Sequence, residues 1–359
     1  MKKHVFVDLH VLQTVPPSCV NRDDTGSPKT AIYGGAERAR VSSQAWKRAM
    51  REYFKDVFAP EQLGSRTKNV PGMLAKEIAA LVPGMGEEAA MKSAMNALKT
   101  IGIKTDDKAK ATSALFFISD AEVRALAKLA AENEKDKKKY ADAIKENPSF
   151  DIVLFGRMAA DDPDLNYDAA AQVAHAISTH AVHTEYDYFT AVDDEQGDDQ
   201  SGAGHLGTVE FNSSTLYRYA TLNVTEAEKN LGKDTAKVVR GFVEAFIRSM
   251  PTGKQNTFAN RTLPDLVYVT IREDQPVNLS GAFETPVANA KNGYAKKSCE
   301  ALLSYADQIY AAFADKPALA LGCCTDPALL GDRAEALPVK TLLDRLEACV
   351  ADVCGKEEA

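Results

Sequence analysis

Residues 34–51 read GGAERARVSSQAWKRAMR and hold five basic side chains against one acidic side chain, although the whole chain has a formal net charge of -8. Ser42 or Ser43 can cap a helix that begins here, because a serine hydroxyl accepts a hydrogen bond from a free backbone N–H group. Four apolar residues follow at spacings of four, three and four, which predicts the buried stripe of that helix. They are Trp46, Met50, Tyr53 and Val57.

The opposite side of this helix is predicted to be polar and basic. Gln44, Lys47 and Arg51 lie at i, i+3 and i+7, so they share a face, and Arg48 borders it. A helix N-terminus favours an anion, and the glycine pair would let the backbone approach a ligand closely. A solvated basic face is the alternative, and composition alone favours it. The polyanion-binding candidates in this region are Arg22, Lys29, Gly34, Gly35, Arg38, Arg40, Ser42, Ser43, Gln44, Lys47, Arg48 and Arg51.

Composition limits the classes of protein to which the chain can belong. Its 359 residues suit one large domain with insertions or two domains, and 45% hydrophobic residues can fill a core. No run approaches the roughly eighteen apolar residues of a membrane span, so no membrane partner is expected. The N-terminal MKKHVFVDLHV fails as a secretory signal, which predicts a cytoplasmic protein. The six cysteines form no C-x-x-C pair, so free thiols are expected.

Segments with strand patterns alternate with helical segments and long insertions, which favours an α+β fold. Apolar residues at both parities of the first strand predict that both of its faces are buried. Helices are expected at 234–250 and through most of the chain beyond residue 291. The predicted strands are HVFVDLHVL at 4–12, FDIVLFG at 150–156, the odd-numbered series within 209–219, and DLVYVTIRE at 265–273.

Three segments interrupt this pattern. Residues 13–35 form a polar loop, and residues 190–207 are too polar and glycine-rich to pack, so a long exposed loop is expected there. Residues 60–148 show short helices broken by VPG motifs, a lysine-rich run at 132–140, and one possible strand at 115–119. This last segment is predicted to be a helical insertion.

Several motifs are better explained without a ligand. GAGHLG at 202–207 fits a dinucleotide-binding pattern but lacks the required strand before it and helix after it. RGFVEAF at 240–246 faintly resembles an RNA-binding signature that belongs on a strand, whereas here it lies in a helical pattern. The histidines at 175, 180 and 183 lie on a predicted helix and its end but lack a third zinc ligand. No cofactor, metal or catalytic residue is therefore assigned.

Seven motifs in order resemble the CasC (Cse4) family, the backbone subunit of the type I-E CRISPR Cascade complex. The resemblance covers roughly residues 4–273. The motifs are SCxNRDD at 18–24, GGxxRxRxSSQxxKRAMR at 34–51, GRM at 156–158, AHAISTH at 174–180, DYFTAVDD at 187–194, HLGTxEF at 205–211 and YRYA at 217–220.

The resemblance implies an RRM-like (ferredoxin-like) palm, a helical finger insertion and a β-hairpin thumb. Copies would stack along the spacer of a CRISPR RNA, and each thumb would flip one base. The partners implied are CRISPR RNA, target DNA through the guide duplex, neighbouring copies of this chain and other Cascade subunits. The expected boundaries are palm 1–59, finger 60–149, palm 150–189, thumb 190–219, and palm completion with a helical C-terminal region 220–359.

The resemblance adds six residues to the expected RNA interface. His205, Leu206 and Gly207 are the candidates for the thumb tip, because an apolar tip suits wedging between bases. The GRM motif adds Gly156, Arg157 and Met158. These assignments make the chain a non-catalytic scaffold that supports antiviral defence.

A metal-dependent nuclease acting on RNA is the alternative, because backbone subunits of related complexes cleave RNA. It would use Asp23 or Asp24, with His180 or Asp193 as helpers. Adjacent carboxylates in a turn more often face solvent, and no constellation here combines a nucleophile, a base and an orienting group.

Overall fold

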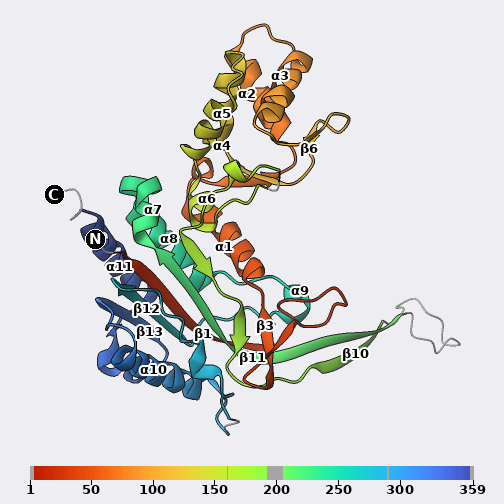
Figure 1. Ribbon diagram of the computed structural model, residues 1–359. Helices are drawn as coiled ribbons and strands as arrows, with labels where there is room; N and C mark the ends of the chain where they lie inside the picture. The colour runs from red at the N-terminus through yellow and green to blue at the C-terminus, as the bar shows by residue number, and fades with distance from the viewer. Residues whose placement is uncertain (1–3, 160, 192–204, 289–290, 356–359) are drawn as a thin grey trace, which may run out of the picture. The chain divides into compact units, whose positions relative to one another are not determined.

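The computed structural model describes residues 4–159, 161–191, 205–288 and 291–355, and it divides into two compact units (Figure 1). The first unit comprises residues Met1–Met50, Val173–Thr221 and Val243–Leu346. The second comprises Arg51–Gln172, Leu222–Phe242 and Glu347–Ala359. The protein is thus a mixed α+β fold, as its sequence predicts.

A mixed ten-stranded sheet forms the centre of the fold, in the order β14-β13-β12-β1-β11-β9-β3-β2, and β10 and β8 also pair with β11. β1 and β12 are antiparallel, with register from Phe6↔Arg272 to Leu12↔Leu266, which confirms the predicted first and last strands. The strands are β1 Phe6–Ser18, β2 Thr30–Tyr33, β3 Ala36–Val41, β8 Ala171–Val173, β9 Ala176–Ser178, β10 Glu185–Ala191, β11 His205–Asn223, β12 Leu266–Arg272, β13 Leu319–Cys324 and β14 Glu335–Ala336.

A buried arginine joins the sheet to two helices, α1 (Ser43–Val57) and α8 (Thr235–Arg248). The guanidinium carbon of Arg218 in β11 lies 3.7 Å from the ring centre of Trp46 and 4.6 Å from that of Phe246. Its nitrogens donate to the Gln13 side chain of β1, at 2.6 Å, and to the Phe246 carbonyl. This side of the sheet is therefore fixed to the start of α1 and the end of α8.

The other side of the sheet is covered by α10 (Ala295–Ala312) and the short helix η4 (Leu279–Phe283). Leu302, Leu303 and Ala306 of α10 are buried in one apolar cluster with Tyr217 and Tyr219 of β11. The odd-numbered residues Tyr217 and Tyr219 thus face α10, whereas the predicted odd parity does not hold along the whole strand, because Val209 and Phe211 are only half-buried and residues 214–220 are buried at both parities. The first unit also contains α9 Gln255–Phe258, and α11 Val339–Gly355 follows the last strand.

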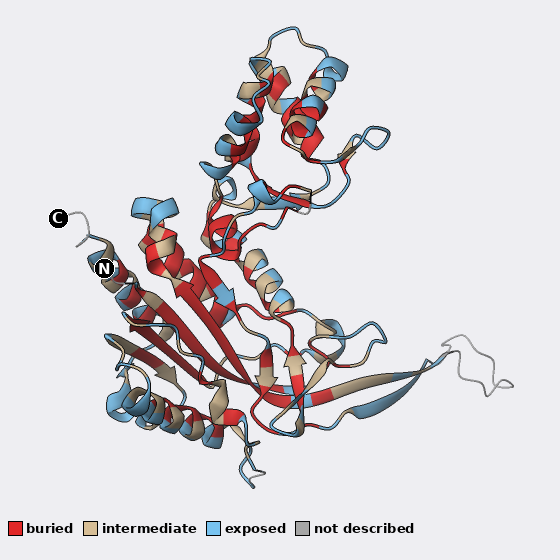
Figure 2. Cartoon of the chain, viewed as in Figure 1, coloured by how far each residue is buried: buried red, intermediate tan, exposed pale blue. Residues whose placement is uncertain are grey.

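The second unit contains a helical subdomain with a continuous apolar core (Figure 2). Its central helices are α2 Val70–Leu81, α3 Glu87–Thr100, α4 Asp120–Ala131 and α5 Lys137–Lys145. Two small antiparallel sheets accompany them: β4 Gly64–Thr67 pairs with the distant β7 Phe116–Ser119, and β5 Thr105–Asp106 forms a hairpin with β6 Ala111–Thr112. The predicted strand at 115–119 is confirmed. The unit also holds α6 Phe150–Phe155 and α7 Val224–Leu231, together with the short helices η1 Pro60–Gln62, η2 Pro163–Leu165 and η3 Gly232–Asp234.

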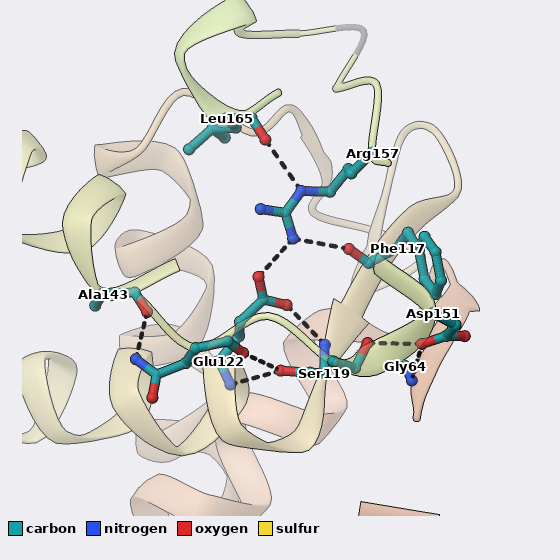
Figure 3. A network of polar contacts seen from close by, with 10 residues as sticks. Gly64, Phe117, Ser119, Glu122, Ala143, Asp151, Arg157 and Leu165 are labelled. Atoms are coloured by element: carbon teal, nitrogen blue, oxygen red, sulfur yellow. Dashed lines mark hydrogen bonds and ion pairs between the residues drawn. The ribbon is translucent and has the colours of Figure 1, made fainter. Parts of the chain in front are cut away.

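A buried ion pair organises the base of this helical subdomain (Figure 3). The Arg157 guanidinium lies 2.6 Å from Glu122 and donates to the carbonyls of Phe117 and Leu165. Glu122 also completes the N-terminal cap of α4 by accepting the Ser119 N–H group at 2.7 Å. Burial raises the pKa of Glu122, and the Arg157 charge opposes that rise. Removing either partner would leave an uncompensated buried charge.

Four sequence predictions are wrong. Residues 13–35 are not one polar loop, because β1 continues to Ser18 and β2 occupies Thr30–Tyr33. Residues 150–155 form the helix α6 rather than a strand, and all six are buried, so its apolar run has no polar face that would indicate a helix. The three histidines lie on no helix, because strand β9 (Ala176–Ser178) follows His175 and pairs with both β11 and β3, and His180 and His183 lie in the connection after it. In α1 the buried stripe continues through Phe54 and Phe58, while Tyr53 and Val57 are only half-buried.

We expect Arg218→Ala to lower the free energy of unfolding by about 3–5 kcal/mol, since it removes a buried cation and leaves the Gln13 and Phe246 acceptors without a donor. Chemical denaturation would measure the loss. Arg333→Ala is the control, because its exposed pair with Asp307 should contribute no more than about 1 kcal/mol. Equal effects of the two substitutions would contradict the role given to Arg218.

Candidate nucleic-acid interface

The loop after β1 is closed by its own hydrogen bonds. Asp23 Oδ1 accepts from the N–H groups of Thr25 and Ser27 at 2.9 and 3.0 Å, and from the Thr25 hydroxyl at 2.7 Å. These bonds, with the Thr25 hydroxyl as the largest contribution, lower the pKa of Asp23. The Lys29 N–H group donates to the Asn21 carbonyl at 2.8 Å and so closes the base of the loop.

Gly34 and Gly35 form the two-residue turn between β2 and β3, and both have positive φ angles, +57° and +73°. Two such residues match the turn type that suits the twist of a hairpin. A Cβ atom on Gly34 would lie 1.6 Å from the Glu284 carbonyl oxygen, whereas one on Gly35 would meet nothing within 4 Å. The close approach at Gly34 is therefore to the protein's own backbone, which corrects the expectation of a ligand contact there.

The N-terminus of α1 is held by side chains from the loop and from the segment before β9. The Ser42 hydroxyl accepts the Ala45 N–H group at 3.3 Å, which confirms the predicted cap. The Ser42 N–H group donates to Asn21 Oδ1 at 2.9 Å, and the Ser43 N–H group donates to His175 Nδ1 at 3.2 Å. Ser42 is itself buried, so its hydroxyl serves the helix rather than a ligand.

His175 links this helix end to Arg40. The Arg40 guanidinium lies 3.4 Å from the same Nδ1 atom and also donates to the Thr30 carbonyl at 3.1 Å. Burial, Arg40 and Lys29 together lower the pKa of His175, which favours the neutral ring that can accept. Sequence reasoning missed this role because the contact joins residues more than 130 positions apart.

The structure brings six of the predicted residues together on one side of the first unit, and we call them the basic face. They come from the closed loop, from β3 and from the first turns of α1, all of which the contacts above tie to one another. Arg22, Gln44 and Arg48 are exposed, and the other three are half-buried. Lys47 is half-buried on the same helix. The basic face comprises Arg22, Lys29, Arg40, Ser43, Gln44 and Arg48.

The guanidinium groups of three predicted arginines already bind other groups of the protein, so they do not belong to the basic face. Arg38 is fully buried and donates to the carbonyls of Ser178, Phe283 and Glu284. Arg157 is buried in the ion pair with Glu122. A polyanion could reach either guanidinium only by displacing these partners within the protein. Arg51 pairs with Asp151 at 3.0 Å and is largely buried.

The other two residues of the GRM motif differ from each other. Gly156 ends α6 with φ +72°, and a Cβ atom there would lie 2.7 Å from the Tyr167 carbonyl oxygen. Its role is thus a turn rather than a ligand contact. Met158 is 87% exposed. It is the member of this motif that a ligand could reach.

A small cavity lies beside the basic face. Its volume is about 20 Å³, and its lining includes Lys29, Arg40, Asn212 and Ser214. The Asn212 side-chain nitrogen is buried and has no hydrogen-bond partner among the described residues. This nitrogen is therefore one donor near the basic face that the described residues leave unpaired.

A two-stranded hairpin extends from the sheet, with β10 paired to the start of β11 from Glu185↔Phe211 to Ala191↔His205. β10 is exposed at every position (Figure 2). Four of the ten exposed large apolar side chains among the described residues lie on this hairpin: Tyr186, Tyr188 and Phe189 on β10, and Leu206 on β11. Gly207 lies beneath the Phe189 ring, where a Cβ atom would come within 2.5 Å. The hairpin thus begins at Glu185, before the predicted boundary.

The residues proposed for metal-dependent cleavage either hydrogen-bond to other groups of the protein or lie apart from one another. No set of three or more potential metal ligands occurs among the described residues. His180 Nδ1 contacts the Ala181 carbonyl and Nε2 accepts the Thr215 N–H group, while Asp23 closes its own turn. Asp193 lies outside the described residues. Within the described residues, no helix is long and apolar enough to span a membrane.

The family described as "CT1975-like protein" matches residues 7–348, and the chain belongs to this family. Its fold is similar to a chain of a "CRISPR RNA-guided surveillance complex, pre-nicking", with a TM-score of 0.84 and 32% identity over 96% of this chain and 100% of that one. A chain of a second "CRISPR RNA-guided surveillance complex" has a TM-score of 0.74 and 28% identity, covering 96% and 99% of the two chains. No curated protein sequence matches significantly.

We expect Gly34→Ala to destabilise the protein more than Gly35→Ala. Both substitutions impose a left-handed conformation that costs about 1–2 kcal/mol, and only the first also collides with the Glu284 backbone. Thermal denaturation of the two variants would separate the two effects. Equal losses would show that the β2–β3 turn does not pack against Glu284 in solution.

Proposed function

We propose that this protein is a non-catalytic subunit that binds CRISPR RNA in a CRISPR RNA-guided surveillance complex. The observation that carries this proposal is the similarity to a chain of such a complex along the whole length of both chains, at 32% identity. The match covers 96% of this chain, so the sheet, the insertion and the hairpin are all included. The chemistry of the basic face supports it independently.

The strand order supports an RRM-like palm. The sequence β12-β1-β11-β9 places the first strand of the chain between the third and the last strands of a β-α-β-β-α-β unit. Its two helices are α1, after β1, and α8, between β11 and β12. In this interpretation the helical subdomain is the finger and the β10–β11 hairpin is the thumb.

The donors of the basic face suit sequence-independent binding. A guide RNA differs in sequence from one spacer to the next, so its carrier must contact phosphate and ribose rather than base edges. Arg22, Arg40 and Arg48 supply charge, while Ser43 and Gln44 supply neutral donors at a helix N-terminus. Arg38 and Arg157 are left out of this interface because their guanidinium groups serve the fold.

The proposed assembly has several copies stacked along the spacer of the guide, in a cytoplasmic type I-E complex that pairs the guide with target DNA. The exposed apolar side chains of the hairpin suit a role as a wedge against an unstacked base, with Leu206 56% exposed near its end. His205 and Gly207 flank it in the strand. Other subunits of the complex would supply any cleavage activity.

Sequencing the nucleic acid that copurifies with the tagged protein from its native operon tests the proposal. We expect short RNAs of one length class that carry spacer sequences. Incubating the same preparation with labelled RNA and divalent metal should leave the RNA intact. Copurification of unrelated cellular RNA, or cleavage that Asp23→Ala abolishes, would count against a non-catalytic guide-binding subunit.

We expect Arg22→Ala with Arg48→Ala to weaken RNA binding and to lower the log–log salt slope by about 1.4, since each phosphate of a single strand that the protein neutralises adds about 0.7 to that slope. Folding should be unaffected because both side chains are exposed. Filter binding over a range of salt concentrations measures the slope. Lys316→Ala with Lys340→Ala removes the same charge from exposed positions elsewhere, and a matching reduction in that control would mean that only net charge matters.

A further inference from the structure

The helical subdomain contains a groove that the proposed RNA interface does not use. Its volume is about 260 Å³, and it lies between α3 and the junction of α4 and α5. Ala89, Ser93 and Ala97 form a row of small side chains along α3, spaced four residues apart. Lys92 begins a parallel polar row that continues with Asn96 and Thr100. Small side chains allow an extended peptide backbone to come close, and the polar row offers it hydrogen-bond partners.

The groove has an excess of positive charge. Lys92 and Lys135 line it from opposite sides, both are exposed, and neither amine has an ion-pair partner among the described residues. Glu134 is the only acidic residue in the described lining, and its charge is already engaged by Lys139 and by two backbone N–H groups. The Lys139 hydrogen bond is the main cause that lowers the pKa of Glu134 to about 2.

A segment of complementary charge occurs elsewhere in the same chain. Residues 193–199, DDEQGDD, contain five carboxylates and no cation. They begin two residues after the end of the exposed strand β10 and lie outside the described residues. Fully extended, seven residues span roughly 24 Å, whereas α3 from Ala89 to Thr100 is about 17 Å long. The segment is therefore long enough to run along the groove.

We propose that the acidic segment 193–199 of one copy docks in the groove of a second copy, between Lys92 and Lys135. This rests on the proposed function only in requiring that copies lie side by side. It would give the helical subdomain a role in assembly and would keep five carboxylates away from the guide phosphates, which repel them. Chain-to-chain contact would then be partly ionic and would weaken as salt rises.

Zero-length carbodiimide cross-linking of complex assembled from an equal mixture of ¹⁵N-labelled and unlabelled subunits tests the proposal directly. We expect linked peptides that join a carboxylate of 193–199 to Lys92 or Lys135 with one partner heavy and one light. Links found only within a single copy, or no links to these lysines, would overturn it. Because this readout does not depend on the bound RNA, it is separate from the copurification test.

Charge reversal gives the energetic test. Lys92→Glu with Lys135→Glu should weaken association between copies by about tenfold, as expected for two exposed ion pairs. Lys108→Glu with Lys110→Glu, exposed in the β5–β6 turn, is the matched control and should have no such effect. Adding Asp198→Lys and Asp199→Lys to the groove variant should restore association in sedimentation velocity.

A nucleic acid in the groove would give a different result. In that case the Lys92→Glu, Lys135→Glu variant would lower the salt slope of RNA binding, and the added lysines at 198 and 199 would not restore association. Either outcome would refute docking of the acidic segment.

Discussion

The stacking of Arg218 between Trp46 and Phe246 is the interaction on which the position of the basic face depends. The partners of this guanidinium among the described residues are two aromatic rings, the Gln13 side chain and a backbone carbonyl, and none of these is a carboxylate. Burial lowers the pKa of Arg218 to about 9, so the group still carries its charge at neutral pH. Ring faces and carbonyl oxygens stabilise the cation without requiring a second buried ion.

This arrangement determines where the first turns of α1 lie. Trp46 is one turn beyond the cap, so fixing its ring over Arg218 also fixes Ser43 and Gln44 at the helix start. The loop and His175 then bind the free N–H groups of that start. The donors at the start of α1 are thus held in place because the buried Arg218 guanidinium fixes Trp46 one turn further along the helix. Rigid donors lose less conformational entropy on binding a ligand than mobile ones.

The sequence predicted the parts of the fold that have a clear local period. β1, α1, α8 and β12 lie where the apolar spacing places them, and Ser42 caps α1 as its position suggests. It did not predict α6, because a short run that is buried on every side has no period to distinguish helix from strand. β9 was missed for another reason, since its extended form comes from pairing with strands far away in the chain.

The candidate site was harder to predict than the fold. Arg38 and Arg40 are two residues apart in one strand, yet Arg38 donates to three carbonyls of the protein while Arg40 belongs to the basic face. Which arginine serves the fold depends on segments near 178 and 283, more than a hundred positions away. Position 34 could not be interpreted from the sequence for the same reason. It requires glycine because the distant backbone at Glu284 lies against it.

The net charge of -8 limits how this site can bind a polyanion. At physiological ionic strength the Debye length is about 8 Å, so the acidic surface opposes an approaching phosphate chain only weakly until contact. Attraction must then come from donors close to the bound phosphates, within about that distance. One basic face supplies only a few such contacts, each sensitive to salt. Repeating the face along a strand would multiply those contacts without making a single copy adhere to nucleic acid at large. A locally basic face on an acidic chain is therefore what a protein needs if it is to bind firmly only when many copies share one strand.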